Sequence, residues 1–145
     1  MITSQIDTDL KVAMLGGDKT SVSTLRGLKS ALQYAAVAKN SDLTESEIIS
    51  VLQKEAKKRT EAAELYKKSG DTERTSQELS ERVIIEKYLP AQASEEEINQ
   101  TIDKVASELG EINRANMGQA IGQAKAKLGP AADGSVIARL IQSRL

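Results

Sequence analysis

Residues 88–97 read Tyr88-Leu89-Pro90-Ala91-Gln92-Ala93-Ser94-Glu95-Glu96-Glu97, and this stretch divides the chain. The residue before a proline avoids helical backbone angles, so the preceding helix must end near Pro90. Ser94 with Glu97 three residues later is a capping box, in which each side chain binds the other residue's backbone N–H. The stretch therefore predicts the end of one helical region, a short link and the start of another.

Before this stretch, apolar residues recur every three or four positions, which predicts four helices at about 2–15, 22–39, 44–68 and 72–88. Thr44 and Glu47 form another capping box, and Asn40 is a candidate left-handed cap. In the fourth helix we expect Leu79, Val83 and Ile84 to face inward.

After the stretch, three helices are expected, beginning at Ser94, Asn116 and Asp133. No run alternates as a strand would. The sequence thus predicts an all-α protein, with an N-terminal bundle of about four helices (1–91) followed by a small three-helix domain (92–145).

The 145-residue composition excludes several classes of site, because the chain has no His, Cys, Trp or Phe. Common zinc sites, cysteine nucleophiles, Ser-His triads and disulfides are ruled out. With three tyrosines as its only aromatic residues, a base-stacking platform is nearly excluded. We expect no catalytic residue, no metal and no cofactor.

The longest uncharged stretch, 115–124, is ten residues, far below the roughly 20 needed to cross a bilayer. The N-terminus also lacks the basic start of a signal peptide. We therefore expect a cytoplasmic protein with no membrane partner.

Charge is unevenly distributed behind the formal net charge of −1. Residues 51–68 have a net charge of +3 (six basic, three acidic), 91–111 of −5 (one basic, six acidic) and 112–145 of +4 (five basic, one acidic). Overall near-neutrality is therefore no evidence against a phosphate-bearing partner.

One candidate site is a basic row on the third helix, formed by Lys54, Lys57 and Lys58 and followed by Arg59. The three lysines share a helical face, and a row of cations can follow a phosphate backbone. The alternative is a solvated face whose cations pair with Glu55, Glu61 and Glu64.

A second candidate is the turn from Gly129 to Gly134, which lies beside Lys125 and Lys127. A tight turn at a helix start can bind phosphate through backbone N–H groups. Equally, Gly129 can simply be a helix C-cap, and Gly118 can serve close helix packing.

The carboxylates Glu78 and Glu81, with Glu64, could form an acid–base pair or a metal site, but ion pairs with Arg59 or Lys57 on another helix are favoured. Arg26, at the edge of an apolar stripe, either packs its stem and pairs with a carboxylate or serves a function.

Several short motifs occur together in a fixed order along the chain. The motifs are Leu25-Arg26-x-x-Lys29, Lys54-x-x-Lys57-Lys58-Arg59, Tyr66, Glu78-x-x-Glu81, Tyr88-Leu89-Pro90, Met117-Gly118 and Asp133-Gly134. In this order and spacing the chain resembles the YqeY family, free-standing relatives of the C-terminal domain of the GatB subunit of tRNA-dependent amidotransferases. In three places the chain departs from the family pattern: Asp71 replaces a usual arginine, Ile121 replaces a usual second methionine, and Pro130-Ala131-Ala132 lacks a common basic residue.

The resemblance implies a helical bundle followed by a three-helix domain, and contact with tRNA or another structured RNA. Amide transfer from glutamine, a carbon–nitrogen ligase activity, would belong to other domains and subunits. Our leading hypothesis is a non-catalytic RNA-contacting accessory protein that uses Lys125, Lys127, Gly129 and Arg139, with the basic row as a second surface. The alternatives are a helical protein–protein adaptor lined by Met117 and, third, a glutamine-dependent amidotransferase. We expect no DNA partner.

Overall fold

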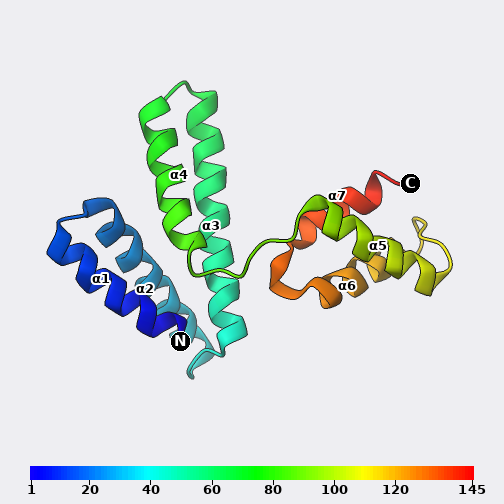
Figure 1. The fold of residues 1–145 in the computed structure, drawn as a ribbon, viewed down its shortest axis with the longest axis horizontal. Helices are drawn as coiled ribbons and strands as arrows, with labels where there is room; N and C mark the ends of the chain where they lie inside the picture. The colour runs from blue at the N-terminus through cyan, green and yellow to red at the C-terminus, as the bar shows by residue number, and fades with distance from the viewer. The chain divides into compact units, whose positions relative to one another are not determined.

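The computed structural model describes all 145 residues and consists of helices without any strand, so the all-α prediction is confirmed. The chain forms two compact units, Met1–Leu89 and Pro90–Leu145, joined by the link that follows the fourth helix (Figure 1). No helix combines the length and apolarity that spanning a membrane requires.

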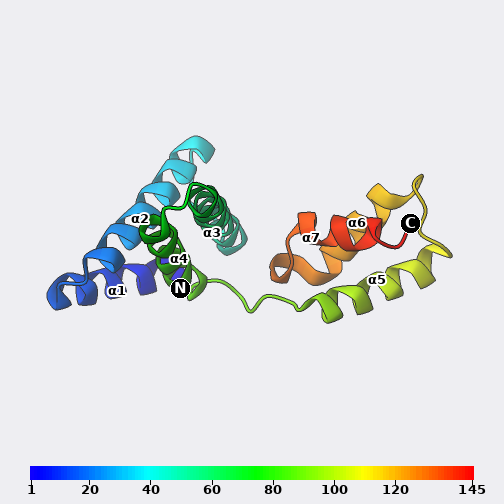
Figure 2. The same ribbon diagram turned by 90° about the horizontal axis from the view of Figure 1, so that it is seen from above.

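Four helices build the first unit: α1 (Ile2–Gly16), α2 (Lys19–Lys39), α3 (Glu45–Lys68) and α4 (Thr72–Glu86). Consecutive helices form two hairpins, α1–α2 and α3–α4, and Figure 2 shows α2 beside the second hairpin. Their shared core joins apolar side chains of all four helices: Ile6, Leu10, Leu25, Leu28, Leu32, Ile48, Leu52, Ala56 and Ile85. Burial of each Leu or Ile side chain contributes about 1.5–3 kcal/mol to folding, so this core holds the four helices together.

The C-terminal end of α3 and the N-terminal end of α4, which meet at the turn between them, contribute little to that core. Past Ala56, α3 buries only Ala63, and α4 buries only Ile85 near its C-terminal end. The distal half of the α3–α4 hairpin is consequently a two-helix projection exposed on most of its surface (Figure 1).

The second unit contains α5 (Glu95–Leu109), α6 (Met117–Leu128), a short 3-10 turn η1 (Gly129–Ala131) and α7 (Gly134–Gln142). Its core combines aliphatic residues of α5 and α7 with alanines of α6 and of the turn after η1: Ile98, Ile102, Val105, Ala120, Ala124, Ala132, Ile137, Leu140 and Ile141. Alanines at the α6 contacts let the three short helices approach closely around one centre.

The predicted helix-end signals are confirmed at Thr44/Glu47, Ser94/Glu97 and Asn40, but not at Asn116. The capping boxes Thr44/Glu47 and Ser94/Glu97 are both complete, and Asn40 has the left-handed φ of 61°. Asn116 precedes α6 but caps no N–H; instead its amide accepts from the Asn113 N–H and donates to the Glu111 carbonyl. Its side chain therefore orders the α5–α6 loop.

The expected inward face of α4 is wrong in part. Leu79 is 42% exposed and Val83 56% exposed, whereas Ile85 is fully buried. The face turned toward α3 carries Glu78 and Glu81, because Arg59 of α3 supplies their counter-charge. An ionic contact therefore replaces the apolar stripe at this helix interface.

Candidate nucleic-acid interface

Three basic residues of the second unit are paired with its acidic helix, whereas Lys104 and Arg114 are exposed and form no ion pair. Lys127 lies 3.0 Å from a Glu108 oxygen, and Arg139 forms an ion pair with Glu95. The guanidinium of Arg144 lies 2.6 Å from an Asp103 oxygen and also donates to the Asn99 carbonyl at 3.1 Å. The acidic segment and the basic C-terminal segment thus neutralise one another by direct contact.

Lys125 fastens the turn that the sequence suggested for phosphate. Its ammonium donates to the carbonyl of Gly129 at 2.9 Å and to that of Ala132. Asp133 caps α7, with a carboxylate oxygen 3.1 Å from the Ser135 nitrogen. Both the cation and this helix start therefore already have protein partners, and an acidic cap repels an anion. Gly129 supports the turn with a φ of 58°, a region that glycine adopts without strain.

Met117 is partly buried and packs against the core of the second unit, where Leu145 is the only large apolar side chain that is exposed. The adaptor alternative, with Met117 lining a groove, stays a prediction. Gly118, in turn, is not explained by close packing, since a Cβ there would meet no atom within 4 Å.

The basic row on α3 is accessible. Lys54, Lys57 and Lys58 are exposed, and neither Lys54 nor Lys57 has a carboxylate partner. Lys58 lies 3.2 Å from Glu55, one helical turn away. The alternative expected the row to pair with Glu55, Glu61 and Glu64, but only the Lys58–Glu55 ion pair forms. Lys54 and Lys57 therefore remain free for a ligand.

Arg59 turns away from the row and into the interface between α3 and α4. Its Nε lies 3.1 Å from a Glu81 oxygen and 3.9 Å from a Glu78 oxygen. The predicted ion pairs between the two helices are therefore present. Gly27 of α2 lies close by, because a Cβ there would sit 4.0 Å from the Arg59 guanidinium. No group of three or more carboxylates is placed to hold a metal ion.

The two glutamates share one cation and are electrostatically unequal. Burial raises the pKa of Glu78, and the neighbouring Glu81 carboxylate raises it further, against the opposing effect of Arg59. The ion pair between Arg59 and Glu81 therefore stabilises the contact between α3 and α4. The ionised form of Glu78 destabilises it, because that charge is partly desolvated and lies beside a second carboxylate.

Other residues of the sequence motifs hold the first unit together. Lys29 on α2 lies 2.8 Å from Asp7 on α1, and the Tyr88 hydroxyl donates to Asp9. Burial, with the Asp9 carboxylate, raises the pKa of Tyr88. Pro90 begins the second unit immediately after this contact. Arg26 remains exposed, without an ion pair.

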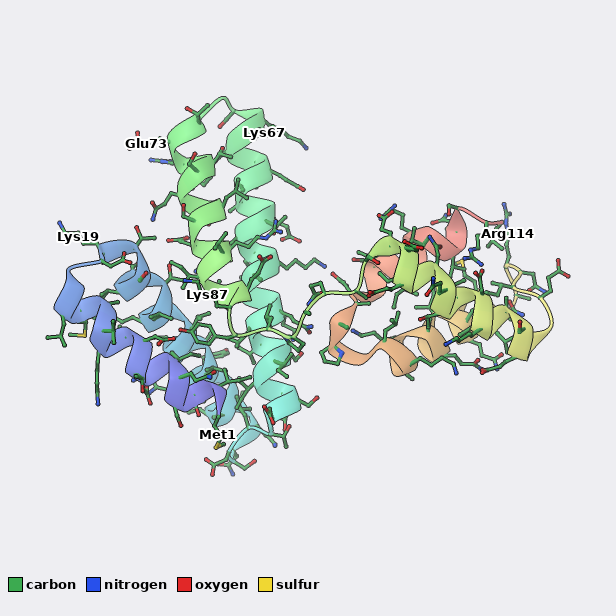
Figure 3. The ribbon with its side chains drawn as sticks, in the orientation of Figure 1. Met1, Lys19, Lys67, Glu73, Lys87 and Arg114 are labelled. Carbon is green, nitrogen blue, oxygen red and sulfur yellow. The ribbon has the colours of Figure 1, made fainter.

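Sequence reasoning missed two cations that the structure places on the same helix. Lys67 and Lys68 are exposed at the end of α3 and have no carboxylate partner. Figure 3 shows Lys67 at the tip of the hairpin, with Glu73 across the turn on α4. The net charge of +3 over residues 51–68 was the signal that could have included them.

The model of a family described as Yqey-like protein matches residues 3–145, nearly the whole chain. No curated protein matches it.

Proposed function

The chain belongs to the YqeY-like family, whose members resemble the C-terminal domain of GatB, and we propose that it is a non-catalytic accessory protein that contacts structured RNA, above all tRNA. The observation that carries the proposal is the basic row of α3. Its cations Lys54 and Lys57 are exposed and need not leave a protein carboxylate to reach a phosphate.

The proposal shifts the expected contact from the second unit to the first. In the second unit, Lys127, Arg139 and Arg144 would each have to exchange a carboxylate for a phosphate, and Lys125 would have to leave two carbonyls. Such exchanges reduce the net gain from each phosphate contact, because the protein contact is lost as the new one forms. A lysine without a protein partner loses no such contact, so the release of counterions from the nucleic acid contributes in full to the free energy of binding.

Few aromatic groups support base recognition. Tyr34 is 80% exposed, but it stands on α2 rather than beside the basic row. Binding therefore rests on backbone and shape, and it should tolerate changes of base sequence while remaining sensitive to salt.

Fluorescence anisotropy with labelled tRNA at low salt tests the proposal. The double variant Lys54→Gln/Lys57→Gln should weaken binding by about tenfold or more, because two phosphate contacts are lost. The matched control is Lys11→Gln/Lys19→Gln, which removes the same charge from exposed lysines without ion pairs on α1 and α2. Figure 3 places Lys19 at the α1–α2 turn, away from α3. Absence of tRNA binding by the wild type, or equal loss in both variants, would refute the proposal.

A further inference from the structure

The outer face of α3 carries a divided charge pattern. We define this face as Lys54, Lys57, Glu61, Glu64 and Lys68, whose spacings of three and four residues place them in one line along the helix. All five are exposed, and they lie on the side opposite Leu52, Ala56 and Ala63, which pack inward. Two lysines therefore stand at one end of the line, two glutamates in the middle and a lysine, with Lys67 beside it, at the other end.

The two glutamates of this face are as free as the lysines. Neither Glu61 nor Glu64 forms an ion pair, although Lys57 and Lys68 lie within one turn of them along the chain. The face therefore presents two separate cationic ends and an unneutralised anionic centre.

This pattern disfavours a single strand lying along α3. Lys57 and Lys68 are eleven residues apart, which is about 16 Å along a helix that rises 1.5 Å per residue. A continuous phosphate backbone covering that length would place phosphates beside Glu61 and Glu64, where like charges repel. Two backbones separated by a groove would meet the lysines and leave the centre free of phosphate.

We propose that the outer face of α3 bridges the two strands of an RNA duplex across its shallow minor groove, with the lysines of each end on one backbone. The minor groove of A-form RNA is wide and displays 2′-hydroxyl groups. In this arrangement Glu61 and Glu64 lie over the groove and accept hydrogen bonds from those hydroxyls, which DNA lacks. The inference rests on the proposed function and names the class of RNA that the site takes: double-stranded segments.

The test uses the full chain and three labelled probes at low salt. These are an RNA duplex of about 20 base pairs, longer than the roughly 16 that a small duplex-binding domain spans, the DNA duplex of the same sequence, and one RNA strand alone. The RNA duplex should bind about fivefold or more tighter than either other probe, as one or two hydrogen bonds to 2′-hydroxyls would provide. Failure of every RNA probe and tRNA to bind would overturn the proposed function, whereas equal binding of the single strand or of DNA would overturn only the bridging inference.

Variants of the two ends and of the centre give opposite expectations. Lys54→Gln/Lys57→Gln and Lys67→Gln/Lys68→Gln should weaken duplex binding by similar factors, because each pair contacts one backbone. Glu61→Gln/Glu64→Gln should reduce the preference for RNA over DNA, because an amide accepts a 2′-hydroxyl less strongly than a carboxylate. General tightening of both duplexes in the glutamate variant, without loss of that preference, would place phosphates at the centre and contradict the inference.

The same face could also pair with the α3 of a second copy, with lysines opposite glutamates. The five residues of the outer face are all charged, and the large apolar side chain exposed beside them on α3 is Leu65. One such side chain is less than the apolar centre that stable interfaces need, which is why RNA is favoured. Light scattering at low salt decides this point: the wild type should be monomeric, and a dimer that Glu61→Gln/Glu64→Gln dissociates would overturn the inference.

Discussion

Replacing Glu81 with glutamine should destabilise the first unit, whereas the same change at Glu78 should leave it equally stable or more stable. Both carboxylates face Arg59, but the Nε–oxygen distance is 3.1 Å for Glu81 and 3.9 Å for Glu78. Their side chains are 16% and 20% exposed, and that of Arg59 is 25% exposed, so water screens the cluster only in part. The Glu81 pair is the attractive contact, and the Glu78 charge lacks a close partner of its own.

The size of the expected change in stability follows from that geometry. Removing one partner of a fully buried ion pair costs about 3–5 kcal/mol, whereas an exposed ion pair contributes about 0.2–1 kcal/mol. Because this cluster is partly solvated, Glu81→Gln should lower the free energy of unfolding by an amount between these limits, about 1–2 kcal/mol. Glu78→Gln removes a poorly paired, desolvated charge and should change it by zero to about +1 kcal/mol.

The effect of Glu78→Gln on the free energy of unfolding should depend on pH, and the direction of that dependence can be predicted. Its pKa is raised in the folded protein above the ordinary value of 4.5. A raised pKa contributes stability below the unfolded value, and that contribution is lost as pH rises through the folded value. The stability of Glu78→Gln relative to the wild type should therefore increase from about pH 4 upward and level off above the folded pKa.

Urea denaturation followed by circular dichroism at several pH values measures both variants, and hydrogen exchange of α3 and α4 peptides assigns the change to the first unit. The reasoning is refuted if Glu78→Gln costs as much as Glu81→Gln at pH 7, or if the two respond to pH identically.

Three further changes test other contacts of the two units. Tyr88→Phe removes the hydroxyl that donates to Asp9 and should cost about 1 kcal/mol in urea denaturation; an unchanged midpoint would show that the contact contributes nothing. Lys125→Met leaves the carbonyls of the 129–132 turn without their donor and should destabilise the second unit by about 1–2 kcal/mol, without weakening tRNA binding in anisotropy. Arg144→Glu should lower stability by about 0.5–1 kcal/mol through repulsion of Asp103, and adding Asp103→Arg should restore it; a double variant no better than the single one argues against the pair.

Helix number and helix ends could be predicted because their causes are local. The Ser94/Glu97 and Thr44/Glu47 capping boxes bring together residues three positions apart, so the sequence itself holds both partners. The left-handed backbone at Asn40 likewise depends on one residue and its position at a helix end.

The inward face of α4 could not be predicted from apolar periodicity alone. Leu79 and Val83 follow the helical spacing of a core stripe, but Arg59, about twenty residues earlier in the chain, draws Glu78 and Glu81 inward instead. Apolar periodicity predicts the inward face only where the inward positions are apolar, and it fails here because a partly buried cation faces two carboxylates.

The sequence was sufficient to predict which basic residues the candidate site contains. It was not sufficient to predict which of them form ion pairs with carboxylates. Arg139 meets Glu95, 44 residues away, and Arg144 meets Asp103, 41 residues away, so no local spacing reveals that these cations are paired. The basic row of α3 was visible because a helix places Lys54, Lys57 and Lys58 together whatever the tertiary structure.

The salt dependence of tRNA binding tests the central claim, that the lysines of α3 contact phosphate, most directly. The logarithm of the binding constant should fall linearly with the logarithm of salt concentration, and Lys54→Gln/Lys57→Gln should reduce that slope by about two, one for each lost phosphate contact. Lys11→Gln/Lys19→Gln, with the same net charge, should leave the slope unchanged. Equal slopes for the wild type and the α3 variant would contradict the account.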